Sequence, residues 1–128
     1  MVKLSPYIFS RDARKQADFY AKALDGEITL VKTFDEMPNV KEDLKGKVMH
    51  LVLKVGDQQF LMADSSSEMS GPIDLVLEFP HESEAQAVFD KLSEGGKVIM
   101  PFEKMFWGTS FGRLEDPFGV RWQIATEA

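Results

Sequence analysis

The chain has no cysteine, and this absence excludes several kinds of chemistry at once. Without thiols the protein has no disulfides, no thiolate nucleophile and no cysteine-ligated zinc. Histidine is scarce as well, because His50 and His81 are the only two in 128 residues. Since His81 falls where a helix is expected to begin, we do not expect a metal site built from two histidines and a carboxylate.

Basic charge and long apolar runs are also lacking. The sequence has 15 Lys and Arg against 21 Asp and Glu, a formal net charge of -6, which argues against nucleic acid as a partner. No apolar run is long enough to span a bilayer. The N-terminal segment MVKLSPYIFSRD lacks the apolar core and cleavage site of a signal peptide. We therefore expect a cytoplasmic protein with no membrane partner.

The composition that remains is that of an ordinary globular domain. Hydrophobic residues make up 44% and charged residues 28% of the chain. A chain of 128 residues can bury a substantial core, so we expect one domain over residues 1–128.

Two parts of the sequence resemble each other at one constant offset. The matched pairs are Gln16/Gln86, Ala17/Ala87, Phe19/Phe89, Gly26/Gly96 and Ile28/Val98. An internal repeat of this kind determines the architecture, so we looked for the same elements around both parts. We interpret the chain as two modules, 1–64 and 72–128, joined by a linker at 65–71.

Each module has the pattern of strand, helix, strand and hairpin. We expect strands at 4–10, 27–34, 47–55 and 58–64, and again at 73–79, 97–102, 105–114 and 120–125. Asp12 is the expected cap of the first helix, and Glu82 or Ser83 that of the second. Asp25-Gly26 and Gly95-Gly96 are expected to end them. The fold class is therefore α+β, with two β-α-β-β-β modules. The polar stretch 35–46 is a long loop, either a lid or partner-binding arm or a disordered surface loop.

Strand alternation assigns side chains to faces. In the strand KVMHLVLKV, His50 lies on the face opposite Leu51 and Leu53, which we assign to helix packing. A neutral imidazole on the other face could act as an acid or base, or could be a hydrogen-bonded structural residue. By the same alternation Asp74 and Glu78 face away from the second helix.

The segment FWGTSFGRLEDPFGVRWQI carries the most specific pattern of the chain. It places Asp116-Pro117-Phe118-Gly119 as a tight turn between two strands, because Pro presets φ and Gly accepts a left-handed conformation. The Phe106-Trp107 pair precedes this turn, and Trp122-Gln123 follows it. Further features are the opening Ser5-Pro6-Tyr7, Met37-Pro38 in the long loop, His50 on its strand and Asp64 at the end of the first module.

In order and spacing these features resemble the vicinal oxygen chelate superfamily of glyoxalases, bleomycin-resistance proteins and dioxygenases, over nearly the whole chain. Within it the chain looks most like the PhnB-like branch, whose members are often labelled demethylubiquinone methyltransferases. The resemblance implies an open, curved mixed sheet around a cavity, with the helices outside, and a homodimer. Methyl transfer is not expected, because the chain has no glycine-rich loop after its first strand and no acid placed to grip a ribose.

The resemblance also indicates where a metal would bind. Carried over by position, the four ligands of the superfamily's metal enzymes fall near Ser5, Met62, Asp74 and Gln123. Asp74 is the one strong ligand type among them, and Gln123 stands where the family normally has Glu. We therefore expect no cofactor and no metal, while a divalent metal, if present, would use Asp74, Gln123 and His50.

The remaining candidates form a ligand site. His50 and Glu78 are the catalytic candidates, and Arg121 with Glu78 is either an ion pair or a ligand-orienting pair. The candidate ligand-binding residues are Phe60, Met62, Phe106, Trp107, Phe111, Arg121 and Gln123. The aromatic side chains of Phe106, Trp107 and Phe111 suit the mouth of a pocket or a dimer interface equally well.

Three functions follow as hypotheses. The first is a binding protein that holds a small, partly apolar molecule in the sheet cavity without a metal. The second is a metal-dependent lyase or dioxygenase of the glyoxalase type with a degenerate site at Asp74, Gln123 and His50. The third is an interaction role through the homodimer.

Overall fold

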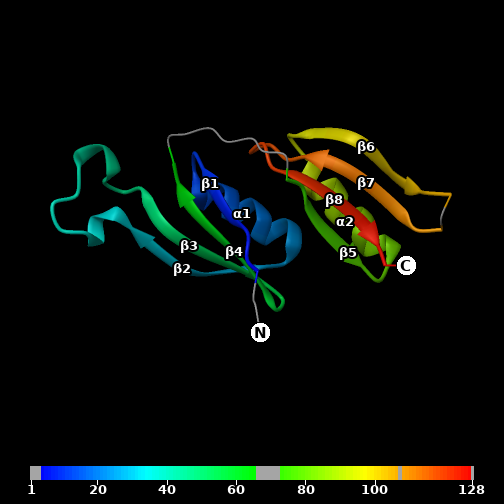
Figure 1. The fold of residues 1–128 in the computed structure, drawn as a ribbon, viewed down its shortest axis with the longest axis horizontal. Helices are drawn as coiled ribbons and strands as arrows, with labels where there is room; N and C mark the ends of the chain where they lie inside the picture. Colours follow the sequence, from blue (N-terminus) through cyan, green and yellow to red (C-terminus); the bar gives the residue numbers. More distant parts are fainter. Residues whose placement is uncertain (1–3, 66–72, 107, 128) are drawn as a thin grey trace. The chain divides into compact units, whose positions relative to one another are not determined.

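The computed structural model describes residues 4–65, 73–106 and 108–127. It divides into two compact units, Met1–Met69 and Ser70–Ala128, and each is described here by itself (Figure 1). Most of the expected linker, and Trp107, lie outside the described residues.

The first unit has the expected order of elements. Strand β1 (Tyr7–Ser10) is followed by helix α1 (Ala13–Leu24), strand β2 (Glu27–Thr33), strand β3 (Val48–Val55) and strand β4 (Gln58–Asp64). The sheet order is β1-β4-β3-β2, with β1 parallel to β4 and the other pairs antiparallel. The long loop contains two short 3₁₀ helices, η1 (Phe34–Glu36) and η2 (Glu42–Leu44).

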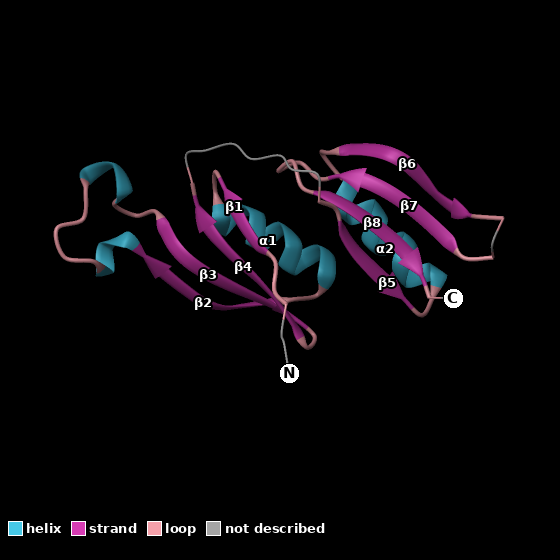
Figure 2. Ribbon diagram, viewed as in Figure 1, coloured by secondary structure: helices cyan, strands magenta, loops and turns pink. Residues whose placement is uncertain are grey.

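The second unit repeats this architecture. It contains β5 (Leu75–Phe79), α2 (Glu82–Ser93), β6 (Lys97–Lys104), β7 (Ser110–Glu115) and β8 (Arg121–Thr126). The sheet order β5-β8-β7-β6 matches that of the first unit, again with one parallel pair (Figure 2). The predicted fold class, α+β with two β-α-β-β-β modules and open mixed sheets, is confirmed.

Each helix covers one face of its own sheet, and the hydrophobic core of each unit lies between that helix and that sheet. Helix α2 buries the face that its periodicity predicts, namely Ala85, Val88, Phe89 and Leu92. Under it lie Leu114, Trp122 and Ile124, which are fully buried. In the first unit α1 buries Ala13, Ala17 and Tyr20 over Leu51 and Leu53.

The two units do repeat the same architecture, but equivalent positions of the two helices are not those paired by the sequence match. Gln16 is fully buried and donates to the Tyr20 hydroxyl (2.7 Å), whereas the matched Gln86 is exposed. Gly26 and Gly96 do correspond, because each begins the approach to the next strand and the residues after each share a bulge, at 28–30 and 98–100. One more residue separates the end of α2 from Gly96 than separates the end of α1 from Gly26.

The helix ends correct two details. Asp12 caps α1 as expected, accepting from the Lys15 backbone N–H (3.1 Å), but α2 begins after His81 without a side-chain cap. Asp25 itself takes the left-handed conformation at the end of α1. Gly26 is needed for another reason, since a Cβ there would lie 2.9 Å from the Lys54 carbonyl oxygen.

The turn between β7 and β8 forms as predicted. Gly119 has a φ of 90° and donates its N–H to the Asp116 carbonyl (3.0 Å). The Asp116 side chain accepts from the backbone of Phe118 (2.9 Å) and Val120 (3.0 Å) and from Trp122 Nε1 (2.9 Å). This one carboxylate therefore ties the hairpin turn to the core tryptophan. Within the described part of the chain, no helix is long and apolar enough to cross a membrane.

Candidate functional site

The face of each sheet opposite its own helix, called the open face here, carries the candidate site residues. Strand pairing places one residue from each strand in a continuous row across the middle of this face. In the first unit this central row is Tyr7, Leu61, Val52 and Leu30. In the second unit it is Val76, Gln123, Arg113 and Met100. The two rows occupy the same positions of the repeated sheet and differ sharply in polarity.

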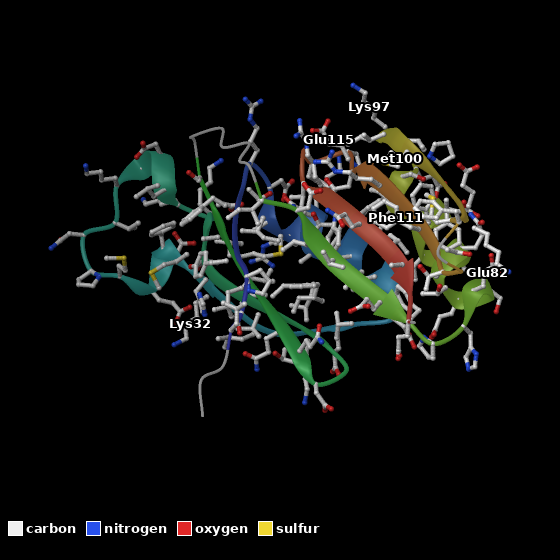
Figure 3. All side chains as sticks on the ribbon, turned by 45° about the vertical axis from the view of Figure 1, so that its right-hand side comes forward. Lys32, Glu82, Lys97, Met100, Phe111 and Glu115 are labelled. Atoms are coloured by element: carbon white, nitrogen blue, oxygen red, sulfur yellow. The ribbon has the colours of Figure 1, made fainter. Side chains whose placement is uncertain are left out.

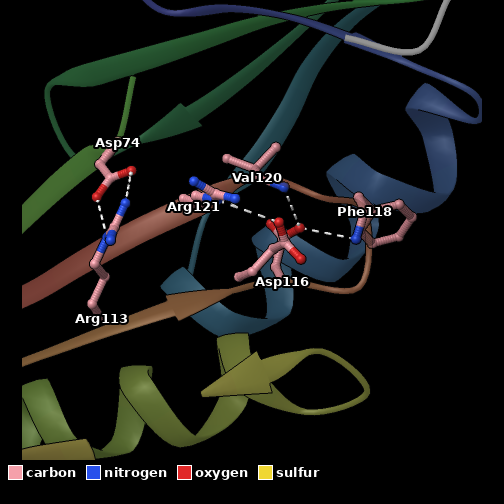
Figure 4. A network of polar contacts seen from close by, with 7 residues as sticks. Asp74, Arg113, Asp116, Phe118, Val120 and Arg121 are labelled. Carbon is pink, nitrogen blue, oxygen red and sulfur yellow. Dashed lines mark hydrogen bonds and ion pairs between the residues drawn. The ribbon is translucent and has the colours of Figure 1, made fainter. Parts of the chain in front are cut away.

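Arg113 is the centre of the second row. Its Nε donates to Asp74 Oδ2 (2.5 Å) and its Nη2 to Asp74 Oδ1 (3.0 Å), which makes a bidentate ion pair (Figure 4). Gln123 Nε2 also donates to Asp74 Oδ2, at 3.0 Å. The Asp74 side chain is only 12% exposed and that of Arg113 31% exposed. The cluster is therefore partly shielded from water, yet it can be reached from the open face.

The electrostatics follow from this geometry. Hydrogen bonding from Arg113 holds the pKa of Asp74 below its ordinary value, against the opposing effect of burial and with a smaller contribution from Gln123. The hydrogen bond to Asp74 in turn raises the pKa of Arg113. The carboxylate is thus ionised at neutral pH and already has its cation.

Sequence analysis identified Asp74 and Gln123 but missed Arg113. Arg113 is 39 residues from Asp74 in the sequence, so local spacing does not associate them. A signal did exist: on β7, Arg113 is two residues from Phe111, which places both on the same face. Phe111 on β7 and Met100 on β6 are labelled in Figure 3, and Phe111 is half-buried.

Arg121 does not pair with Glu78. Its Nε instead donates to Glu115 Oε1 (3.4 Å), because Glu115 is its direct cross-strand partner on β7. Glu78 is exposed and pairs in register with Ala125 on β8, so the expected Arg121–Glu78 contact is wrong. The exposed Arg121–Glu115 pair contributes little to stability.

In the first unit His50 lies beside an aromatic surface. The Tyr7 hydroxyl and His50 Nδ1 are 3.3 Å apart, and their ring centroids are separated by 5.9 Å. The Tyr7 and Phe9 rings are 5.1 Å apart, and these side chains are 43% and 48% exposed. Sequence analysis did not single out Tyr7 or Phe9 as site residues, although two aromatics at i and i+2 on a strand share a face.

Phe60 and Met62 lie on the opposite face from the one expected. They pair with Leu53 and Leu51 on β3 and are buried under α1, where Phe60 contacts Tyr20 with ring centroids 6.4 Å apart. Both residues belong to the core, because every second residue of β4 points toward the helix. The residue that β4 contributes to the central row of the open face is Leu61.

This strand pairing also moves one of the expected metal-ligand positions, that of Met62, by one residue. Leu61 lies between Tyr7 and Val52, as Gln123 lies between Val76 and Arg113, so Leu61 rather than Met62 is equivalent to Gln123. Phe106 is 96% exposed. Trp107 falls outside the described residues, so its role stays a prediction.

The donors at these positions do not fit a divalent metal. Both Asp74 oxygens accept from Arg113, so a metal here would have to compete with a fixed guanidinium of like charge. Gln123 directs its amide N–H toward Asp74, and Leu61 has no donor atom. Across residues 4–65, 73–106 and 108–127, no three His, Asp or Glu side chains gather as a metal site would require.

Comparison with known proteins establishes the family. The profile of the Glyoxalase/Bleomycin resistance protein/Dioxygenase superfamily matches residues 3–124, and the chain belongs to this superfamily. Among curated proteins it is similar to YjdN of Escherichia coli (strain K12), with 28% identity over 94% of this chain and 92% of that protein.

Two solved structures support the same branch. Protein PA1353 from Pseudomonas aeruginosa is 28% identical with a TM-score of 0.88, over 99% of this chain and 98% of that one. A PhnB protein from Bacillus cereus, described as a putative 3-demethylubiquinone-9 3-methyltransferase, is 27% identical with a TM-score of 0.81, over 98% of this chain and 100% of that one. These neighbours are consistent with the PhnB-like branch of the superfamily.

Proposed function

We propose that this protein binds small, partly apolar molecules on the open face of a single sheet, without using a metal. The observation that carries the proposal is the composition of the two central rows. The second row, taken by itself, carries a preformed cluster of Asp74, Arg113 and Gln123 between apolar Val76 and Met100. The first row separately carries apolar and aromatic side chains. Apolar walls with a few well-placed polar groups are typical of small-molecule sites.

The aromatic surface of the first unit is a separate candidate for binding an apolar group. Tyr7 and Phe9 leave about half of their area exposed, and large exposed aromatics are costly unless something covers them. Their neighbouring rings, tilted by 37° to each other, offer an aromatic surface to a ring or a chain of the ligand.

A metal-dependent lyase or dioxygenase is the alternative that this site supports less well. Such an enzyme would need Asp74 free to coordinate, and Asp74 is held by Arg113. Methyl transfer, which the printed description of the Bacillus cereus protein suggests for that protein, is not part of our proposal.

The test is a thermal-shift screen of small aromatic and aliphatic compounds, followed by calorimetry on each hit. We expect some compounds to raise Tm further as their concentration increases, and the shift to shrink in a Phe9→Ala variant. Phe19→Ala on α1 is the matched control, since it removes an aromatic ring from a helix and not from the open face.

Metal content per chain, measured on untagged protein purified without chelator, decides between the two functions. Stoichiometric metal bound through Asp74 would favour the enzyme. A broad screen without any hit would count against the binding function.

A further inference from the structure

The polar cluster of the second unit is not required by the fold. Val52 and Leu61 in the first unit occupy the positions of Arg113 and Gln123 in the second, and the first sheet forms the same strand pairs with these apolar residues. A shielded ion pair loses hydration energy, and replacing one with apolar residues is often neutral or stabilising. The cluster therefore calls for an explanation beyond stability.

The geometry of the guanidinium leaves one of its edges unused. Asp74 occupies the edge formed by Nε and Nη2. The other edge, formed by Nη1 and the second N–H of Nη2, donates to no residue in the described part of the chain. Because Asp74 anchors the planar group, the free edge is held in a defined orientation, with part of Arg113 exposed on the open face.

We propose that Arg113 is the specificity-determining residue of the ligand site and binds a carboxylate of the ligand through this free edge. Asp74 and Gln123 position it. The inference rests on the proposed function and specifies its substrate class as small apolar or aromatic carboxylic acids. Two parallel N–H groups match the two coplanar oxygens of a carboxylate, which is the geometry in which arginine binds such groups most strongly.

The second sheet offers contacts for both the polar and the apolar part of such a ligand. Val76 and Met100 flank the polar pair in the same row and are exposed by 55% and 41%, so apolar surface borders the free edge of Arg113. Gln123 has one remaining N–H and a carbonyl oxygen, which can bond a second polar group of the ligand.

The experiment compares matched acids and amides as probes. Benzoate, 2-naphthoate and 4-phenylbutyrate are each paired with their neutral primary amide, and binding to the full chain is measured by calorimetry. For the wild type we expect each acid to bind more tightly than its amide. In Arg113→Met this preference should disappear, with acid affinity falling about tenfold or more.

Two further variants make the result specific. Arg113→Lys keeps the positive charge but loses the two-donor edge, so it too should lose most of the acid preference. Arg14→Met removes an exposed arginine on α1 and should leave all affinities unchanged. Arg113→Met could fold poorly because Asp74 is left without its cation. In that case the double variant Asp74→Asn/Arg113→Met, which also removes the negative charge at position 74, takes the place of the single variant in the comparison.

The outcomes separate this inference from the proposed function. Acids that bind equally well to wild type and Arg113→Met, or amides that bind as tightly as acids, would overturn the role of Arg113 and leave a small-molecule binding protein. Absence of binding by every acid and every amide would contradict the proposed function, and the inference with it.

Discussion

Asp116 is a buried carboxylate whose oxygens accept hydrogen bonds from Phe118, Val120 and Trp122. We expect Asp116→Ala to lower the free energy of unfolding by about 2–4 kcal/mol, because these donors lose a charged acceptor in a shielded environment. Urea denaturation followed by tryptophan fluorescence measures the change. Asp57→Ala, at the exposed turn between β3 and β4, is the control and should change stability by less than about 0.5 kcal/mol.

Arg113 and Asp74 give a second prediction at this scale, and it concerns pH. We expect Arg113→Met to lower the free energy of unfolding at pH 7, by less than the loss of a fully buried pair because Arg113 is partly exposed. The pKa of Asp74 is lower in the folded protein than in the unfolded chain. The ionised carboxylate therefore stabilises the fold at any pH above the pKa that Asp74 has in the unfolded chain. This stabilisation is lost as the pH falls through the pKa of Asp74 in the folded protein.

The difference in stability between wild type and Arg113→Met should therefore be largest near neutral pH and shrink as the solution is acidified below about pH 4. Denaturation at a series of pH values checks this, and NMR titration of the Asp74 carboxyl should show a higher pKa in the variant. A difference that stays constant or grows toward acid pH would contradict the ion pair.

At the scale of elements, the join between helix and strand depends on glycine in both units. A Cβ at Gly96 would lie 2.2 Å from the Glu115 carbonyl oxygen, which belongs to backbone and cannot move aside cheaply. We expect Gly96→Ala to cost about 3 kcal/mol, the upper end for overpacking, measured by thermal or urea unfolding.

Gly56→Ala provides the comparison for that prediction. Gly56 has a φ of 58° and no atom within 4 Å of an added Cβ, so alanine there suffers only the left-handed backbone, about 1 kcal/mol. Equal losses for both variants would show that β7 yields to the added methyl group.

The elements themselves were largely predictable from the sequence. Both helices, the eight strands of the described residues and the β7–β8 turn were expected, because period and turn chemistry are local properties. Most bounds lie close to the observed ones, but β7 begins at Ser110 and not at 105. The helix phase was not. Matching Gln16 with Gln86 was wrong because residue identity was taken for equivalence, whereas burial depends on which turn of the helix meets the sheet.

At the scale of the whole molecule, the superfamily membership predicts a homodimer. Both open faces carry large exposed apolar residues, among them Tyr7, Phe9 and Val76, and association of two chains is one way to cover such surface. We expect light scattering at micromolar concentration to give about twice the 14.5 kDa chain mass, and Tm to rise with protein concentration. A monomer with a concentration-independent Tm would refute the dimer.

Several features of this protein were determined by its sequence alone: the repeat, the order of elements and the family. Each follows from local periodicity or from a pattern of residues in order. The tertiary structure decided which residues meet across strands. Asp74 binds Arg113, Arg121 binds Glu115, and Leu61 rather than Met62 matches Gln123, because bulges and turn lengths set the register between strands and one residue of shift reverses a side chain's face.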